Sequence, residues 1–224
     1  HNRAAVGKAL LADQMGRIRS HAAQYPCGVA PGVDSCQMAA RRQADTGIME
    51  NASKRGRYAI VVIAASAGGV QALQKLLSAL PHDFPIPIAI VQHRSSHAPY
   101  LLAPVLGRHT RLKVKLAEAG EMVGAGTVYL APPQRHLVVR PGGTLALVNG
   151  HKIRHVLSSA NPLFASAAEV FPGGVIAVVL TGGDSDATDG VQSVAHSGGV
   201  VIAQDEASCA VFGMPRSAIA TGAV

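Results

Sequence analysis

This chain has a serine, a histidine and an aspartate in the segments that follow three of its apolar runs. Together these three residue types can carry out acyl transfer. They are Ser66, His93 and Asp186, and the runs before them span residues 58–65, 86–92 and 175–180. A serine hydroxyl is a weak nucleophile, but an imidazole can take its proton and a carboxylate can hold that imidazole in the required tautomer. The set therefore predicts a serine hydrolase. Its order, Ser–His–Asp, differs from the Ser–Asp–His order of α/β-hydrolases, so a distinct hydrolase fold is expected.

The residues after the serine favour electrostatic stabilisation of a reacting oxygen. Ala67, Gly68 and Gly69 are small and leave backbone N–H groups unobstructed, and a helix is predicted to begin directly after them. Backbone N–H groups at a helix N-terminus are suited to binding an oxyanion.

Each of these residues also has a simpler interpretation. Ser66 could be the N-cap of the helix that follows it, and His93 could be a structural histidine at the end of a strand. Asp184 and Asp189 flank Asp186, so any of the three could be a cap or turn residue. The glycine-rich turn could instead bind phosphate, but it lacks the GxGxxG and GK[ST] patterns, and no acidic residue ends the second strand to bind a ribose.

The elements that would position these residues alternate between strand and helix. The near-continuous β-branched runs are typical of strands buried on both faces of a parallel sheet. Helical patterns are expected over residues 70–80, 162–171 and 191–196, and a further strand over 200–203. Between Thr127 and Val148 the pattern changes to short strands, 127–131, 136–140 and 144–148, which predict an antiparallel insertion with a hairpin turn at 141–143.

These patterns predict an α/β fold with a doubly wound, mostly parallel sheet flanked by helices and a small antiparallel hairpin insertion. Ligands of such sheets bind beyond the C-terminal ends of the strands, where Ser66, His93 and Asp186 are expected. One domain is predicted over residues 58–224. Residues 1–57 show no strand and helix alternation, and we expect a basic extension or linker, partly helical over 4–23 or disordered.

Composition argues against several other functions. The net charge is +7, but residues 1–57 hold nine Lys and Arg against four Asp and Glu, so most of the excess lies in that segment. Four Phe, four Tyr and no Trp offer few surfaces on which bases could stack, so no nucleic-acid partner is expected. Three cysteines without CxxC spacing predict neither a disulfide framework nor a zinc site, and they favour the cytoplasm. The longest apolar run, 59–65, is too short to span a bilayer, so no membrane insertion is expected.

The same motifs resemble the catalytic domain of the chemotaxis protein-glutamate methylesterases, the CheB type, over residues 58–224. The resemblance is carried by Ile63–Gly69, Ile90–His93, Val128–Pro132, Leu180–Asp186 and the long closing segment Ile202–Arg216. It implies that Ser66 is the nucleophile, His93 the general base and Asp186 the residue that orients the base. It also implies that the backbone amides of Ala67 and Gly183 hold the oxyanion.

The resemblance further implies a substrate and partners. The substrate would be glutamate methyl esters on the cytoplasmic region of methyl-accepting chemotaxis receptors, hydrolysed to glutamate and methanol. Deamidation of receptor glutamines would be a second activity, and no metal or organic cofactor is expected. Residues 1–57 are too short for the receiver domain of many family members, so we expect a tether or packing arm instead.

The chain departs from the family pattern in the loops that hold the site. Ala67 stands where the family usually has threonine, and Gly183-Asp184 stands where it has Met-Gly. The altered loop around Asp184 keeps open an alternative, a catalytically silent interaction module of the same fold. Substitutions of Asp184 and Asp189 are expected to have mild effects. His155, in a matching Arg-His pair, and Met214 are candidates for lining the site, although a structural role is equally consistent for His155, and packing is expected of Met214.

Overall fold

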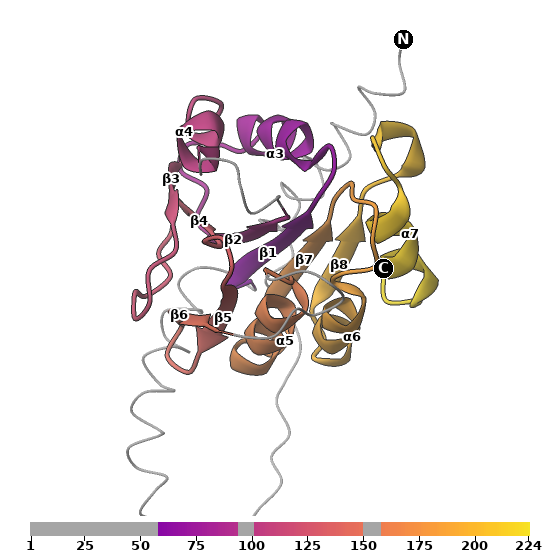
Figure 1. Cartoon of the computed structure of the whole chain (residues 1–224). Helices are drawn as coiled ribbons and strands as arrows, with labels where there is room; N and C mark the ends of the chain where they lie inside the picture. Colours follow the sequence, from indigo (N-terminus) through magenta and orange to yellow (C-terminus); the bar gives the residue numbers. More distant parts are fainter. Residues whose placement is uncertain (1–57, 94–100, 150–157) are drawn as a thin grey trace, which may run out of the picture.

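A parallel sheet forms the centre of the chain in the computed structural model, which describes residues 58–93, 101–149 and 158–224 (Figure 1). In this part of the chain, six strands pair in the order β3-β4-β2-β1-β7-β8, and every pairing is parallel. The strands are β1 (Ile60–Ala65), β2 (Ile88–Gln92), β3 (Lys113–Leu116), β4 (Thr127–Leu130), β7 (Val175–Val179) and β8 (Val200–Ala203). The predicted fold class is therefore confirmed.

Helices cover both faces of this sheet (Figure 1). They are α3 (Gly69–Ser78) and α4 (Leu102–Gly107) on one face, α5 (Asn161–Val170) and α6 (Thr188–His196) on the other, and α7 (Gly213–Ala220) beside β8, after the short 3₁₀ turn η1 (Glu206–Ser208). None of the helices in the described residues has both the length and the apolar composition needed to cross a membrane.

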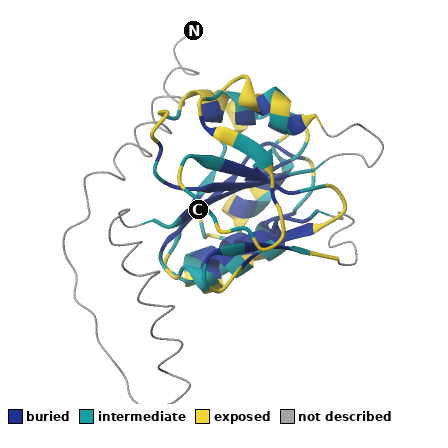
Figure 2. Cartoon of the chain, turned by 90° about the vertical axis from the view of Figure 1, so that its left-hand side faces the viewer, coloured by how far each residue is buried: buried dark blue, intermediate teal, exposed yellow. Residues whose placement is uncertain are grey.

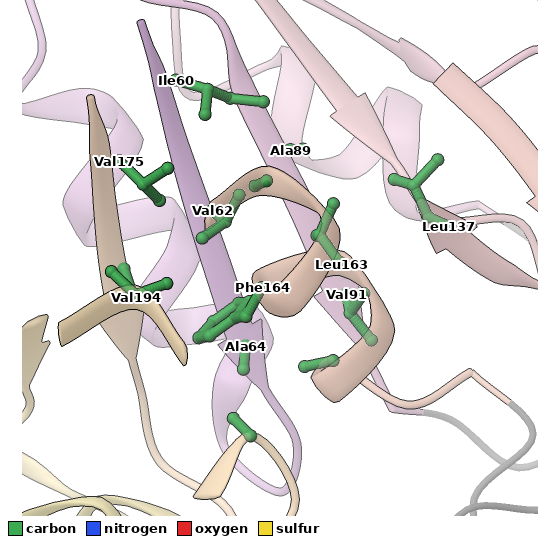
Figure 3. Close-up of a cluster of buried hydrophobic side chains, with 14 of the residues drawn as sticks. Ile60, Val62, Ala64, Ala89, Val91, Leu137, Leu163, Phe164, Val175 and Val194 are labelled. Carbon is green, nitrogen blue, oxygen red and sulfur yellow. The ribbon is translucent and has the colours of Figure 1, made fainter. Parts of the chain in front are cut away.

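The central strand shows why the sheet forms. All six residues of β1 are buried, and Figure 2 shows the inner strands in the dark colour of buried residues. The alternating side chains of β1 enter two different cores. Val61 and Ile63 pack with Leu73 of α3, whereas Val62 and Ala64 pack with Phe164 of α5 (Figure 3). A continuous apolar run is therefore required here, where a strand with one solvent face would alternate.

The antiparallel insertion is smaller than the sequence pattern indicated. β5 (His136–Arg140) and β6 (Thr144–Val148) pair antiparallel, and Gly142 and Gly143 turn between them with positive φ angles of 86° and 74°. β4, expected in the same insertion, instead pairs parallel with β2 and β3. That prediction was wrong because a short local pattern does not encode which distant strand will be its neighbour.

The strand order places a topological switch point between β1 and β7. From β1 the chain continues to β2 on one side of the sheet, and it returns later to β7 on the other side. The loops that leave the C-terminal ends of two such strands diverge and leave a crevice between them, which is where ligands of open α/β sheets bind. Ser66 follows β1, and the loop that contains Asp184 and Asp186 follows β7.

Candidate active site

The C-terminal ends of β2, β1 and β7 bring the predicted residues to one edge of the sheet. The backbone N–H of Ser66 donates to Thr181 O at 2.9 Å, and the N–H of His93 donates to Ala65 O at 2.8 Å. The amide of Gln92 donates both to Ser66 O, at 2.8 Å, and to His93 O, at 2.9 Å. These hydrogen bonds hold the loop that begins at Ser66 next to the loop that begins at His93.

The turn after β1 leaves the Ser66 side chain free of any capping role. Helix α3 has Gly68 as its N-cap, with a positive φ of 77°, and no side chain caps it. The tight turn is closed by Gly69 N–H donating to Ser66 O at 2.8 Å, and a Cβ at Gly69 would lie 2.2 Å from Gln92 Oε1. The N-cap interpretation of Ser66 therefore does not hold in this structure.

His93 and Asp186 form a buried ion pair. His93 Nε2 lies 2.7 Å from Asp186 Oδ2, and the aspartate is only 1% exposed. Its Oδ1 accepts from Ser159 Oγ at 2.6 Å, and its Oδ2 accepts from the Ala160 N–H at 2.6 Å. Burial acts to raise the pKa of Asp186, but the hydrogen bonds from His93, Ser159 and Ala160 outweigh it and hold that pKa below its ordinary value.

Helix α5 contributes to this carboxylate site. Ala160 is the N-cap of α5, so its N–H points from the positive end of the helix dipole toward Asp186. Ser159 was not identified from the sequence, because nothing in its spacing links it to a loop 27 residues further along the chain. The two donors fix the carboxylate in the orientation that His93 meets.

A second carboxylate contacts the other nitrogen of the same ring. Asp184 Oδ2 lies 3.2 Å from His93 Nδ1, and Asp184 Oδ1 accepts from the Asp186 N–H at 2.9 Å. The contact with Nδ1 is close enough for an ion pair, but the carboxylate lies off the direction of the ring N–H, so Nδ1 has no well-aligned hydrogen bond among the described residues. The sequence pattern did not predict a contact between Asp184 and the base.

The two carboxylates make His93 strongly basic. Burial alone would lower the pKa of His93, but the close contacts with the negative charges of Asp184 and Asp186, together with the hydrogen bond to Asp186, outweigh burial and raise that pKa to about 9. The contact with His93 is also the main cause that lowers the pKa of Asp184. The arrangement therefore stabilises the imidazolium form of His93.

The Ser66 hydroxyl makes no hydrogen bond with His93 or Asp186 among the described residues. Ser66 is half-buried, and within the described residues no hydrogen bond joins its Oγ to the His93 ring. Its Cβ packs against Gly182, where an added Cβ would lie 2.8 Å from it. The structure brings His93 and Asp186 into contact and places Ser66 on the adjoining loop. The roles of all three residues in catalysis remain predictions.

The two backbone amides expected to hold the oxyanion are both available. Ala67 and Gly183 are exposed, and neither N–H donates to a backbone carbonyl within the described part of the chain. Thr181 Oγ1 donates to Ala67 O at 2.9 Å and so orients that turn. The arrangement can supply two N–H donors beside Ser66.

The two candidates for lining the site have different outcomes. Met214 is fully buried, its N–H donates to Gly182 O at 2.9 Å, and its sulfur lies where a Cβ of residue 182 would be, so it packs behind the loop. His155 lies outside the described residues, as does the segment 1–57. Among the described residues, no cluster of three or more His, Cys, Asp or Glu side chains could hold a metal ion.

Comparisons with known proteins find similar sequences. The sequence profile of the family described as CheB methylesterase matches residues 61–224. Protein-glutamate methylesterase FrzG of Myxococcus xanthus is 41% identical over 191 residues, which cover 84% of this chain and 57% of that protein. A protein-glutamate methylesterase/protein-glutamine glutaminase of Rhizobium meliloti is 43% identical over 74% of this chain and 47% of its own length.

A solved structure has the same fold as this chain. The crystal structure of the Thermotoga maritima CheB methylesterase catalytic domain matches with a TM-score of 0.72 and 40% sequence identity, over 75% of this chain and 90% of that one. The chain spans about half the length of the curated relatives it matches.

Proposed function

The chain belongs to the CheB methylesterase family, and on that premise we propose that it is a serine hydrolase that removes methyl groups from glutamate methyl esters of chemotaxis receptors. The observation that carries this proposal is the buried pair of His93 and Asp186 at the switch point of the sheet, next to the Ser66 turn. A binding module would gain nothing from a buried charged pair there, because such a pair is costly to desolvate. The alternative, a catalytically inactive interaction module of the same fold, is therefore less well supported.

The proposed reaction has two steps. Ser66 Oγ attacks the ester carbonyl and gives its proton to His93 Nδ1, since Nε2 is already engaged by Asp186. The N–H groups of Ala67 and Gly183 receive the developing negative charge, and methanol leaves with the proton from His93. Water then hydrolyses the acyl-enzyme through the same base, which frees the glutamate carboxylate and restores Ser66.

Deamidation of receptor glutamines is a second activity that the same site would support. Ammonia would leave in place of methanol, and the acyl-enzyme and its hydrolysis would be identical. Relatives from Anaeromyxobacter dehalogenans and Rhizobium meliloti carry both activities in their names. The partner proposed for either reaction is the cytoplasmic helical region of a methyl-accepting receptor.

The catalytic unit that we propose begins near residue 58. The family match starts at residue 61 and β1 starts at Ile60. A truncated chain that begins at Arg57 is expected to fold and to hydrolyse ester at the rate of the full chain. Loss of folding would show that residues 1–57 complete the core, and activation by several fold would show that they inhibit the site.

Intact-mass spectrometry of a receptor fragment tests the function. The fragment should carry both methylated glutamates and glutamines, so that ester hydrolysis and deamidation give different mass changes. We expect the full chain to remove methyl groups and the Ser66→Ala variant to leave the fragment unchanged. An unchanged fragment with the full chain across neutral and alkaline pH would contradict the proposal.

A further inference from the structure

His93 is held between two carboxylates, although the proposed reaction needs only one. Asp186 engages Nε2 at 2.7 Å, and Asp184 lies 3.2 Å from Nδ1. Nδ1 is the nitrogen left for the Ser66 proton. The second carboxylate therefore stands at the position that the nucleophile needs.

The protonation state follows from the geometry of the ring. When Nε2 donates its proton to Asp186, a neutral ring has an unshared electron pair on Nδ1. A carboxylate oxygen at 3.2 Å is repelled by the partial negative charge on Nδ1 of a neutral ring, whereas it is attracted by the positive charge of an imidazolium. The observed contact is favourable only when both nitrogens carry protons. The His93 side chain is 7% exposed and the Asp184 side chain 37% exposed, so solvent screens this attraction in part.

We propose that Asp184 is a positioning residue that pairs with His93 Nδ1, holds the ring in its protonated form and so restrains ester hydrolysis at neutral pH. This inference rests on the proposed function. The charged groups that face His93 from the described residues are Asp184 and Asp186, both on the loop after β7. If Asp184 were replaced, Asp186 would be the one carboxylate among the described residues that contacts His93.

The chemistry of the restraint is a competition for one nitrogen. A protonated Nδ1 cannot accept the Ser66 proton, so the nucleophile stays a hydroxyl until the ring loses its proton. The raised pKa of about 9 agrees with this state, because about 1% of such a ring is neutral at pH 7. Hydrolysis should therefore accelerate as the pH rises toward 9, and a substrate or partner that displaces Asp184 from the ring would relieve the restraint.

The Asp184→Asn variant isolates the charge. Its amide oxygen can still accept from the Asp186 N–H, so the turn is retained, while the negative charge beside Nδ1 is lost. The matched control is Asp189→Asn, the same change at an exposed position in the first turn of α6. A second variant, Asp184→Ser, repeats the test if the first does not fold by circular dichroism.

Two measurements on the full chain decide the proposal. The first is the pH profile of methanol release from the methylated receptor fragment, and the second is the NMR titration of the His93 ring. We expect Asp184→Asn to lower the His93 titration by about one pH unit and to raise methanol release at pH 7 by about tenfold, with the two proteins converging above pH 9. Asp189→Asn should leave both measurements unchanged.

Other outcomes would overturn the proposal. An unmoved His93 titration in Asp184→Asn would show that the contact does not hold the proton. A rate lowered equally at every pH would show that Asp184 assists the base instead of restraining it. If no protein releases methanol at any pH, the proposed function fails, but the titration still decides whether Asp184 holds the ring protonated.

Discussion

Gly182 lies where the Ser66 turn and the loop after β7 meet, and an added methyl group there should separate activity from stability. A Cβ at this position would lie 2.2 Å from Met214 Sδ and 2.8 Å from Ser66 Cβ. Both distances are well inside the roughly 3.5–4.0 Å at which carbon atoms make favourable contact. Since Gly182 has no positive φ angle, the backbone itself would accept alanine, and the effect of Gly182→Ala is steric.

The expected magnitudes follow from this overlap. Met214 is fully buried and cannot move into solvent, so the loop must shift, and overpacking of this kind costs about 1–3 kcal/mol. The shift also displaces Ser66, and a misplacement of about 1 Å at a reacting group can cost about 100-fold in rate. Gly182→Ala is therefore expected to lose about 100-fold in methanol release while the protein stays folded.

Urea unfolding and methanol release from the methylated receptor fragment measure the two effects. Gly183→Ala is the matched control for stability, because its Cβ would meet nothing closer than Val211 Cγ1 at 3.7 Å. The double variant Gly182→Ala with Met214→Ala relieves the sulfur contact only, so it should be less destabilised than the sum of the single variants and remain slow. A Gly182→Ala protein with full stability and full activity would refute this account of the loop.

Two further predictions concern the buried pair. Ser159→Ala removes one donor to Asp186, so we expect a loss of about 1–3 kcal/mol in the free energy of unfolding in urea and slower turnover; no change in either would show that the 2.6 Å hydrogen bond contributes little. The pKa of His93, raised from 6.5 to about 9, contributes stability that is fully present below pH 6.5 and is lost as the pH rises through 9. The free energy of unfolding should therefore fall by about 3 kcal/mol between pH 6 and pH 10. A free energy that does not change over this range in the full chain would contradict the raised pKa of His93. An equal fall in the His93→Gln variant would contradict it as well.

The main strands could be predicted from the sequence because their signal is local. Every residue of β1 and of β7 is buried, and so is every residue of β2 except Gln92. β3 was missed because Lys113–Leu116 is a short edge strand without an apolar run, and α4 because Leu102–Gly107 is only six residues long and contains a proline.

The part of the site that could be predicted from the sequence consists of residues that follow the ends of strands. His93 and Asp186 meet because the strands before them end at one edge of a parallel sheet. The contacts of Ser159 and Asp184 depend on the paths of irregular loops, which periodicity does not describe. For Asp184 the sequence left open a cap or turn role and predicted only mild effects of substitution; the residue does close a turn through Oδ1, but its other oxygen faces the base.

The central claim is that Ser66 is the nucleophile that the His93–Asp186 pair activates. Its most direct test compares methanol release from a methylated receptor fragment by the unaltered chain and by Ser66→Ala, at pH values from 7 to 9. The account predicts release by the unaltered chain that rises with pH, and none above background by Ser66→Ala, whose fold should be intact because the half-buried hydroxyl has no hydrogen-bond partner among the described residues. Release by Ser66→Ala at the rate of the unaltered chain would contradict the account.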